Sequence, residues 1–394
     1  MSKLRVLVVD DSVVMRRLVG EVLSADPEIV VVGTASSGKV ALSRLSQLAP
    51  DLVVLDVEMP DLDGLATLAA LRKTHQKLPV IMFTAATQRA AAAMIEALML
   101  GANDYVTKPD GIATLDQTRE RIRTTLVTKI KNLLRPATVP SGTTTRIPRI
   151  DVRPQTGAIA AIDATRPVTT SIPKVRLKTG LLPNLGSHGA RARTIRAIAI
   201  GVSTGGPLAL ERLFAELHTL SVPIFVVQHM PPVFTAMLAQ RLAKVARMPV
   251  VEAVPGTRVE PGCIYIAPGD RHMVVVNEDG VPTVRCTQDP PENSCRPAVD
   301  VLFRSVATIY GSEILAVVMT GMGQDGLRGC EHVRDHGGTV IVQDAATSVV
   351  WGMPGAVVRA GLADAIVPLP QLALELERRC DNGAAHVATG MSRG

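Results

Sequence analysis

A serine among glycines ends a nearly unbroken apolar run in the second half of the chain. Ser203 lies in Gly201-Val202-Ser203-Thr204-Gly205-Gly206-Pro207, directly after the apolar residues 198–200. This pattern predicts a buried strand, a tight turn and a helix that begins near Pro207. Such a turn exposes a hydroxyl beside bare backbone N–H groups, which are the nucleophile and the oxyanion donors of acyl transfer. A phosphate-binding loop or a helix cap would explain the same residues. A catalytic role for Ser203 therefore requires a general base close to its hydroxyl.

Residues that could activate this serine follow two other apolar runs. His229 comes after residues 224–227, one strand–helix–strand unit beyond Ser203, so adjacent parallel strands would place both at the same sheet edge. Asp325 comes after residues 314–319 and could hold the imidazole in one tautomer. Capping the following helix is another role for Asp325 and is compatible with this one. We therefore predict that Ser203, His229 and Asp325 act as nucleophile, general base and orienting carboxylate.

Three other interpretations of the sequence are disfavoured, because the motifs that each one requires are incomplete or in the wrong order. Gly201-x-Ser203-x-Gly205 matches the nucleophile elbow of α/β-hydrolases, but in that fold the histidine comes last, whereas here it precedes the aspartate. The same glycines lack the Gly-Lys-Ser/Thr ending of a nucleotide-binding phosphate loop. His332 and His336 share a predicted helix face, yet no third metal ligand accompanies them.

Carboxylates and a lysine lie at strand ends in the first part of the chain. The residues that follow the first, third, fourth and fifth apolar runs there are Asp10, Asp11, Asp56, Thr84 and Lys108. Ligands bind beyond the carboxyl ends of the strands in open parallel sheets, so these side chains should converge. Carboxylates that share one crevice repel unless a hard divalent cation such as Mg²⁺ joins them. A threonine and a lysine opposite could hold an anion's oxygens, which predicts phosphoryl transfer to a carboxylate.

Alternating strands and helices must position both sets of residues. In the first part, strand-like runs at 5–9, 29–32, 52–55, 80–83 and 104–106 alternate with helical patterns at 13–23, 39–48, 65–73, 88–100 and 115–134. Later strand-like runs lie at 195–200, 224–227, 264–266, 273–276, 314–319 and 339–342. Short loops and strict alternation predict an α/β protein. We expect an N-terminal (βα)5 domain and a C-terminal doubly wound, mainly parallel α/β domain.

A basic segment separates the two domains. Residues 135–193 carry ten Lys or Arg and only two Asp or Glu, and they are rich in Pro, Thr, Gly and Ser. This composition predicts a flexible linker, and without interleaved aromatic residues it argues against a nucleic-acid partner. We expect domains at 1–125 and 194–380, a helix end with the flexible basic linker at 126–193, and a disordered tail at 381–394.

Composition narrows the protein class further. Of the 394 residues, 47% are hydrophobic and only 2% aromatic, which favours the aliphatic cores of parallel sheets. No apolar run approaches the ~20 residues that span a bilayer, and no signal peptide is recognisable, so we expect a cytoplasmic protein without membrane insertion. The five cysteines lack paired short spacing, which predicts reduced thiols and neither disulfides nor a zinc site.

Residues 1–125 resemble the response regulator receiver domain. The motifs that carry the resemblance are Asp10-Asp11, Asp56-Val57-Glu58-Met59-Pro60, Thr84-Ala85 and Lys108-Pro109. The resemblance implies that Asp56 accepts a phosphoryl group from a histidine kinase, with Thr84 and Lys108 contacting that group. It also implies that Asp10, Asp11 and Asp56 bind Mg²⁺. Tyr105 matches the aromatic position that reorients on activation in this family.

Residues 194–370 resemble the catalytic domain of the chemotaxis protein-glutamate methylesterase (CheB) family. The shared stretches are Gly-Val-Ser203-Thr-Gly-Gly, Gln-His229-Met-Pro, Asp300-Val-Leu-Phe, Thr-Gly-Met-Gly-Gln-Asp325-Gly and Trp351-Gly-Met-Pro-Gly-Ala. The resemblance implies hydrolysis of glutamate γ-methyl esters on chemoreceptors, glutamine deamidation, and no cofactor for ester hydrolysis. The backbone N–H groups of Thr204 and Met322 are the oxyanion candidates. Cys295 departs from the family pattern, which has a polar residue there, often His.

The order of the two domains suggests control of the esterase by phosphorylation. We expect the unphosphorylated receiver to cover the carboxyl edge of the catalytic sheet and phosphorylation of Asp56 to favour an open arrangement. A transcriptional regulator would instead carry a helix-turn-helix output, which the strand–helix alternation disfavours. The same esterase in a non-motility chemosensory pathway is the alternative function.

Overall fold

The computed structural model describes residues 3–85, 87–109, 114–134 and 194–390, which fall in one compact unit. The predicted linker lies outside these ranges, apart from residues 126–134, which are helical as expected. None of the described helices combines the length and the apolar character that a membrane-spanning helix needs.

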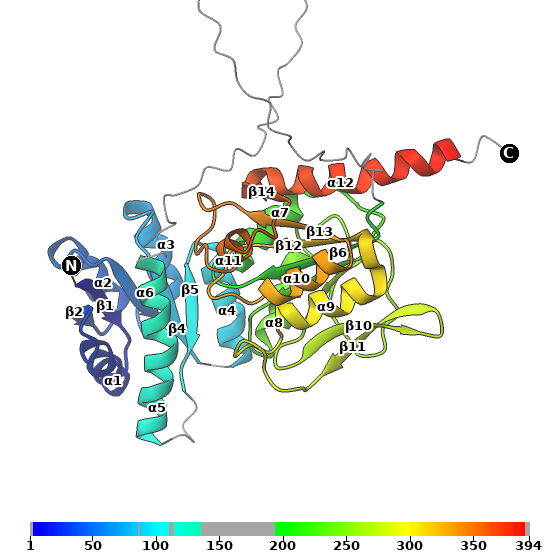
Figure 1. Ribbon diagram of the computed structural model, residues 1–394. Coiled ribbons are helices and arrows are strands. Elements are labelled where there is room, and N and C mark those ends of the chain that lie inside the picture. Colours follow the sequence, from blue (N-terminus) through cyan, green and yellow to red (C-terminus); the bar gives the residue numbers. More distant parts are fainter. Residues whose placement is uncertain (1–2, 86, 110–113, 135–193, 391–394) are drawn as a thin grey trace, which may run out of the picture. The chain divides into compact units, whose positions relative to one another are not determined.

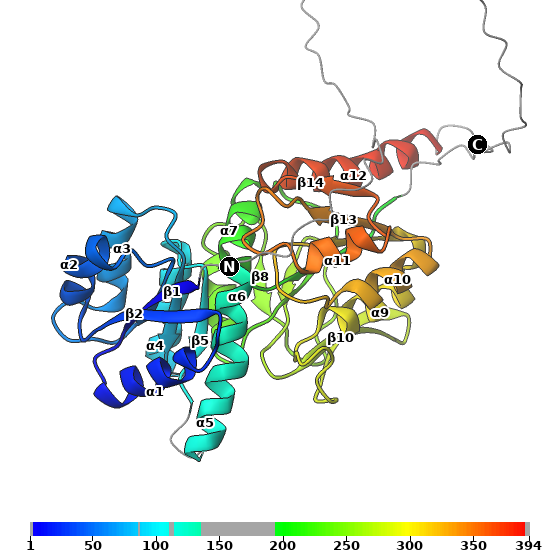
Figure 2. The same cartoon turned by 60° about the vertical axis from the view of Figure 1, so that its left-hand side comes forward.

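The N-terminal domain is a five-stranded parallel sheet with helices on both faces (Figures 1 and 2). Its strands are β1 (Leu4–Val9), β2 (Ile29–Ala35), β3 (Leu52–Asp56), β4 (Val80–Thr84) and β5 (Asp104–Thr107), in the order β2-β1-β3-β4-β5. Its helices are α1 (Val13–Ser24), α2 (Gly38–Leu48), α3 (Gly64–Thr74), α4 (Gln88–Met99) and α5 (Leu115–Ile122), followed by a π-helical turn (Arg123–Val127) and α6 (Thr128–Leu134). The predicted (βα)5 architecture is confirmed.

The C-terminal domain is built on a seven-stranded parallel sheet, in the order β14-β13-β12-β6-β7-β9-β8. These strands are β6 (Ala197–Val202), β7 (Ile224–Gln228), β8 (Val250–Glu252), β9 (Ile264–Ile266), β12 (Ile314–Val318), β13 (Thr339–Gln343) and β14 (Ala365–Val367). The helices are α7 (Gly206–Glu216), α8 (Phe234–Leu242), α9 (Val299–Tyr310), α10 (Leu327–Asp335), α11 (Met353–Arg359) and α12 (Leu369–Gly390), with a 3-10 turn at Gly311–Glu313. The predicted doubly wound, mainly parallel fold is confirmed.

Both faces of this sheet are buried, which explains its near-continuous apolar strands. In β6, Ile198 and Ile200 pack into one hydrophobic cluster, whereas the alternating Ala197 and Ala199 pack into another on the opposite face. The side chains of β6 therefore hold the strand rigidly, and its carboxyl end is a firm support for the residues that follow.

Two elements differ from the expectations. The apolar run at 273–276 belongs to an antiparallel hairpin outside the main sheet, formed by β10 (His272–Glu278) and β11 (Val281–Thr287). Helix α12 continues to Gly390, where a disordered tail from residue 381 was expected. The alanines of this segment are strong helix formers, so a helix that has already begun at Leu369 can extend through it.

Candidate active site

Strand order brings the three predicted catalytic residues to one sheet edge. Strand β6 lies between β12 and β7, and the residues Ser203, His229 and Asp325 follow β6, β7 and β12 respectively. The chain continues from β6 to β7 on one side and later returns to β12 on the other. This reversal makes a crevice beyond the strand ends, where open α/β sheets bind their ligands.

The turn after β6 holds Ser203 against the loop that follows β12. The Ser203 backbone N–H donates to the Thr320 carbonyl at 3.0 Å, and the Gly206 N–H donates to the Ser203 carbonyl at 2.8 Å. Gly205 adopts a φ of 77°, a left-handed conformation that glycine reaches without strain. A Cβ on Gly321 would lie 2.9 Å from the Ser203 Cβ, so only glycine lets the two loops approach this closely.

Asp325 is fixed by backbone and side-chain donors and orients His229. His229 Nε2 lies 2.8 Å from Asp325 Oδ2. The same carboxylate accepts hydrogen bonds from the first N–H groups of α9, at Val299 (2.7 Å) and Asp300 (3.1 Å), and from Asn293 Nδ2 (2.9 Å). Burial would raise the pKa of Asp325, but His229 and these N–H groups outweigh it and lower the pKa. Asp325 is therefore an ionised, immobile acceptor for the imidazole.

The second nitrogen of His229 is the one available for a reacting group. His229 Nδ1 lies 3.6 Å from Cys295 Sγ. Burial would lower the pKa of His229, but the hydrogen bonds and charges of Asp325 and Cys295 outweigh it and raise the pKa to about 10. Across the described residues, Ser203 Oγ makes no hydrogen bond with this ring, although both residues line the same pocket.

Residues of both domains line that pocket, which is small. Its walls are Leu98, Asp104, Tyr105, Lys129, Ser203, Thr204, Gly205, Pro207, Gln228 and His229, and its volume of about 10 Å³ is room for about one water molecule. Thr204 Oγ1 donates to Asp104 Oδ2 at 2.5 Å, and Lys129 Nζ lies 2.6 Å from Asp104 Oδ1. The Tyr105 ring stacks on Phe234 with centroids 5.4 Å apart.

The two oxyanion candidates, Thr204 and Met322, directly follow Ser203 and Gly321, whose backbones approach each other closely. Neither the Thr204 nor the Met322 backbone N–H donates to another group in the part of the chain that the structure describes. The hydroxyl of Thr204 is bonded to Asp104, and the Met322 sulfur lies 2.6 Å from Asn132 Nδ2. Both residues that could stabilise an oxyanion are thus in contact with the N-terminal domain.

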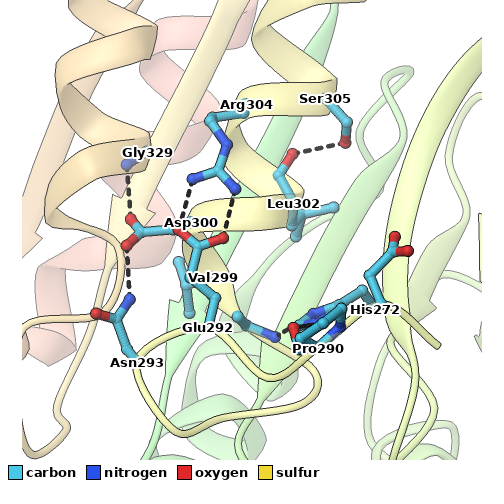
Figure 3. Close-up of polar contacts among 12 residues, drawn as sticks. His272, Pro290, Glu292, Asn293, Val299, Asp300, Leu302, Arg304, Ser305 and Gly329 are labelled. Atoms are coloured by element: carbon cyan, nitrogen blue, oxygen red, sulfur yellow. Dashed lines mark hydrogen bonds and ion pairs between the residues drawn. The ribbon is translucent and has the colours of Figure 1, made fainter. Parts of the chain in front are cut away.

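Sequence reasoning missed three supporting residues. Gln228 donates from Nε2 to the carbonyls of Ser203 (3.0 Å) and His229 (3.3 Å) and so ties the two backbone segments together. Asn293 donates to Asp300, as Figure 3 shows, and also to Asp325. Burial, together with the charge of Asp325, raises the pKa of Asp300 to about 6. The shared stretches Gln-His229-Met-Pro and Asp300-Val-Leu-Phe were the available signals for Gln228 and Asp300, whereas no motif in the sequence marks Asn293.

The second predicted cluster also forms, at the carboxyl ends of β1, β3 and β5. Ligand oxygens of Asp10, Asp11 and Asp56 lie within 4.8 Å of one another. Lys108 Nζ lies 2.9 Å from Asp10 Oδ2 and 2.7 Å from Asp56 Oδ2. Burial raises the pKa of Asp56 to about 6, against the opposing effect of Lys108. Three carboxylates facing one ammonium leave excess negative charge, so this oxygen-rich site fits Mg²⁺. Thr84 is buried at the end of the neighbouring β4.

Comparisons with known proteins agree with both predicted domains. The sequence matches the response regulator receiver domain family over residues 6–120 and the CheB methylesterase family over residues 198–376. It is 46% identical over 386 residues to a protein-glutamate methylesterase/protein-glutamine glutaminase of Trichodesmium erythraeum, covering 96% of this chain and 99% of that protein. A protein of the same name from Nocardioides sp. is 46% identical over 379 residues, with 96% of each chain covered.

Among solved structures, the Thermotoga maritima CheB methylesterase catalytic domain is 41% identical, with 48% of this chain and 98% of that chain covered and a TM-score of 0.46. The full-length identities above decide the assignment: this chain belongs to the protein-glutamate methylesterase/protein-glutamine glutaminase family, with a receiver domain preceding a CheB methylesterase domain.

Proposed function

We propose that this protein is a phosphorylation-activated esterase that hydrolyses glutamate γ-methyl esters on chemoreceptors, and that it also deamidates receptor glutamines. The observation that carries the proposal is the His229–Asp325 pair at 2.8 Å on the sheet edge that Ser203 shares. The relatives named protein-glutamate methylesterase/protein-glutamine glutaminase support both the substrate and the second activity.

The catalytic roles follow from the hydrogen bonds that the two ring nitrogens of His229 make. Asp325 occupies His229 Nε2, so Nδ1 is the nitrogen that takes the proton from Ser203 Oγ as the serine attacks the ester carbonyl. The oxyanion that forms is stabilised by the Thr204 and Met322 backbone N–H groups. His229 then returns its proton to the departing methanol and activates the water that releases glutamate. Ester hydrolysis needs no metal in this scheme.

Control by phosphorylation acts through the contacts on Thr204. With Asp104, Tyr105 and Lys129 lining the pocket, a receptor side chain has no room beside Ser203. Phosphorylation of Asp56 by a histidine kinase favours an arrangement in which these contacts are broken. Asp10, Asp11 and Asp56 would hold Mg²⁺, which neutralises charge on the phosphoryl group when bound, while Thr84 and Lys108 contact its oxygens.

The partners follow from the chemistry. A methylated chemoreceptor is the substrate and a chemotaxis histidine kinase is the phosphodonor. We place the protein in the cytoplasm, where the methylated helices of such receptors lie. An equivalent pathway unrelated to motility would use the same site and the same reaction.

Methanol release from methylated receptor membranes tests the function. We expect the intact protein with Mg²⁺ and a small phosphodonor to release methanol, and Ser203→Ala to lose about 10⁴- to 10⁶-fold of that rate. Ser221→Ala, at an exposed serine of the same domain, is the matched control and should keep the full rate. Near-normal release by Ser203→Ala would overturn the proposal.

A further inference from the structure

A thiol lies against the same histidine that serves Ser203. Cys295 Sγ is 3.6 Å from His229 Nδ1, while Asp325 holds Nε2 at 2.8 Å. Ligand atoms of Cys295, His229 and Asp325 all lie within 4.8 Å of one another. A nucleophile beside a base, with the base oriented by a carboxylate, is the arrangement that activates cysteines in enzymes. Cys295 therefore forms a second nucleophile–base–carboxylate arrangement with His229 and Asp325, and its thiol has no part in the ester hydrolysis described above.

A rigid turn places the thiol there. The Cys295 N–H donates to the Glu292 carbonyl at 2.8 Å, and the Glu292 N–H donates to the Cys295 carbonyl at 3.1 Å. Between them, Asn293 and Ser294 have φ values of 52° and 61°, as in a two-residue hairpin turn.

This turn is anchored to α9 on both sides, as Figure 3 shows. Glu292 accepts two hydrogen bonds from Arg304, at 2.8 and 2.6 Å, and Asn293 donates to Asp300 Oδ2 at 2.7 Å. The bidentate pair and the hydrogen bond from Asn293 tie the turn to α9 at two points. The approach of Cys295 to His229 is thus a consequence of the fold.

The other cysteines are poorer nucleophiles. Cys263 and Cys330 are buried, and burial raises the thiol pKa of both, as it does at the partly buried Cys286 and Cys380. A raised pKa lowers the thiolate fraction at neutral pH, and the thiolate is the reactive form. Cys295 is partly exposed, as Cys286 and Cys380 also are, and it has an imidazole beside it to take its proton.

We propose that Cys295 is a modification site for soft electrophiles and peroxides, and that modification of its sulfur switches off ester hydrolysis. His229 Nδ1 accepts the thiol proton, and the sulfur attacks the electrophile. With iodoacetamide a C–S bond forms, the C–I bond breaks and iodide leaves. With hydrogen peroxide an S–O bond forms and the O–O bond breaks. Sulfur is oxidised to the sulfenic acid, and the departing hydroxide takes the proton from His229 to become water.

Modification of Cys295 should inhibit ester hydrolysis because the thiol and the serine hydroxyl use the same imidazole nitrogen. Ser203 and Cys295 both depend on His229 Nδ1, because Asp325 occupies Nε2. A group added to the sulfur lies against this face of the ring and keeps the serine hydroxyl from it. A thiol reductant should remove the sulfenic acid and restore the serine's access, whereas the carbamidomethyl adduct is permanent.

Limited alkylation of the intact chain tests the reactivity without any receptor. Iodoacetamide is added at neutral pH, and the modified cysteine is identified by peptide mass spectrometry over time. We expect Cys295 to react at least tenfold faster than Cys286, its partly buried counterpart on β11, and Asp325→Asn to slow the labelling of Cys295 alone. Equal or slower labelling of Cys295 would overturn the proposal, whether or not the protein proves to be an esterase.

Methanol release then tests the consequence. Loss of activity should track the labelling of Cys295 in the intact protein and in Cys286→Ser. Cys295→Ser should be resistant to both iodoacetamide and peroxide while keeping a measurable rate. Full activity after complete labelling of Cys295, or equal sensitivity of Cys295→Ser, would contradict the switch. The inhibition part rests on the proposed esterase function; loss of methanol release in unlabelled protein would refute that function and leave the labelling result standing.

Discussion

Replacing Asp104 by alanine should release the esterase from its receiver without phosphorylation. Asp104 is only 4% exposed, accepts a 2.5 Å hydrogen bond from Thr204 Oγ1 and pairs with Lys129 at 2.6 Å. The Asp104→Ala variant loses both interactions, whereas Asp104→Asn keeps an oxygen that can accept from Thr204. Comparing the two variants therefore separates the contribution of the Asp104 charge from that of its hydrogen bond with Thr204.

The size of the effect follows from the chemistry of this contact. A hydrogen bond to a charged group contributes about 1.5–3 kcal/mol. Since 1.4 kcal/mol is a factor of about ten, its loss should shift the equilibrium between closed and open arrangements by about 10- to 100-fold. The basal rate should rise by that factor as long as the closed arrangement still predominates. For Asp104→Asn we expect less than about tenfold, since a neutral hydrogen bond contributes about 0.5–1.5 kcal/mol.

The assay is methanol release by the unphosphorylated chain, with Mg²⁺ chelated, and again at saturating phosphodonor. Asp104→Ala should raise the rate of the unphosphorylated chain and leave the rate at saturating phosphodonor unchanged. The ratio of the phosphorylated to the unphosphorylated rate should therefore fall. A basal rate within twofold of the parent protein would refute the role of this contact. A fall in both rates would show instead that Asp104 supports the catalytic domain.

Three further predictions concern the two sites. Asp325→Asn should lower methanol release by about 10⁴-fold, because an amide N–H would face His229 Nε2 and favour the wrong tautomer; Asp300→Asn, at the adjacent carboxylate, should lose far less. Because the pKa of His229 is raised to about 10 and the base must be neutral, the rate of the unphosphorylated chain should climb with pH from 7 toward 10. Cys295→Ala removes one of the groups that raise this pKa and should move the rise to lower pH. Because burial raises the pKa of Asp56 to about 6 and a carboxyl group must be ionised to hold a cation, the Mg²⁺ affinity measured by calorimetry should fall by up to about tenfold per pH unit below that value, and a flat affinity between pH 5 and 7 would contradict this.

Much of the candidate site was predictable because strand ends are visible in sequence. The apolar runs before Ser203, His229 and Asp325 predicted the strands, and parallel pairing of those strands places their carboxyl ends along one edge of the sheet. The same reasoning placed Asp10, Asp56 and Lys108 together. These predictions needed only the alternation of elements and the rule for parallel sheets.

The remaining residues depend on tertiary contacts that no local pattern encodes. Thr204 and its partner Asp104 are 100 positions apart, and their hydrogen bond joins two separately patterned domains. Asn293 and Cys295 reach the site through a turn that Arg304 anchors, so their proximity follows from side-chain packing and not from strand order.

The most direct test of the central claim is covalent labelling of the intact protein with a fluorophosphonate, read by peptide mass spectrometry. We expect a single adduct on Ser203, formed faster with phosphodonor and Mg²⁺ and lost in His229→Ala. An adduct on another residue, or no adduct on Ser203 in a preparation that releases methanol, would contradict it.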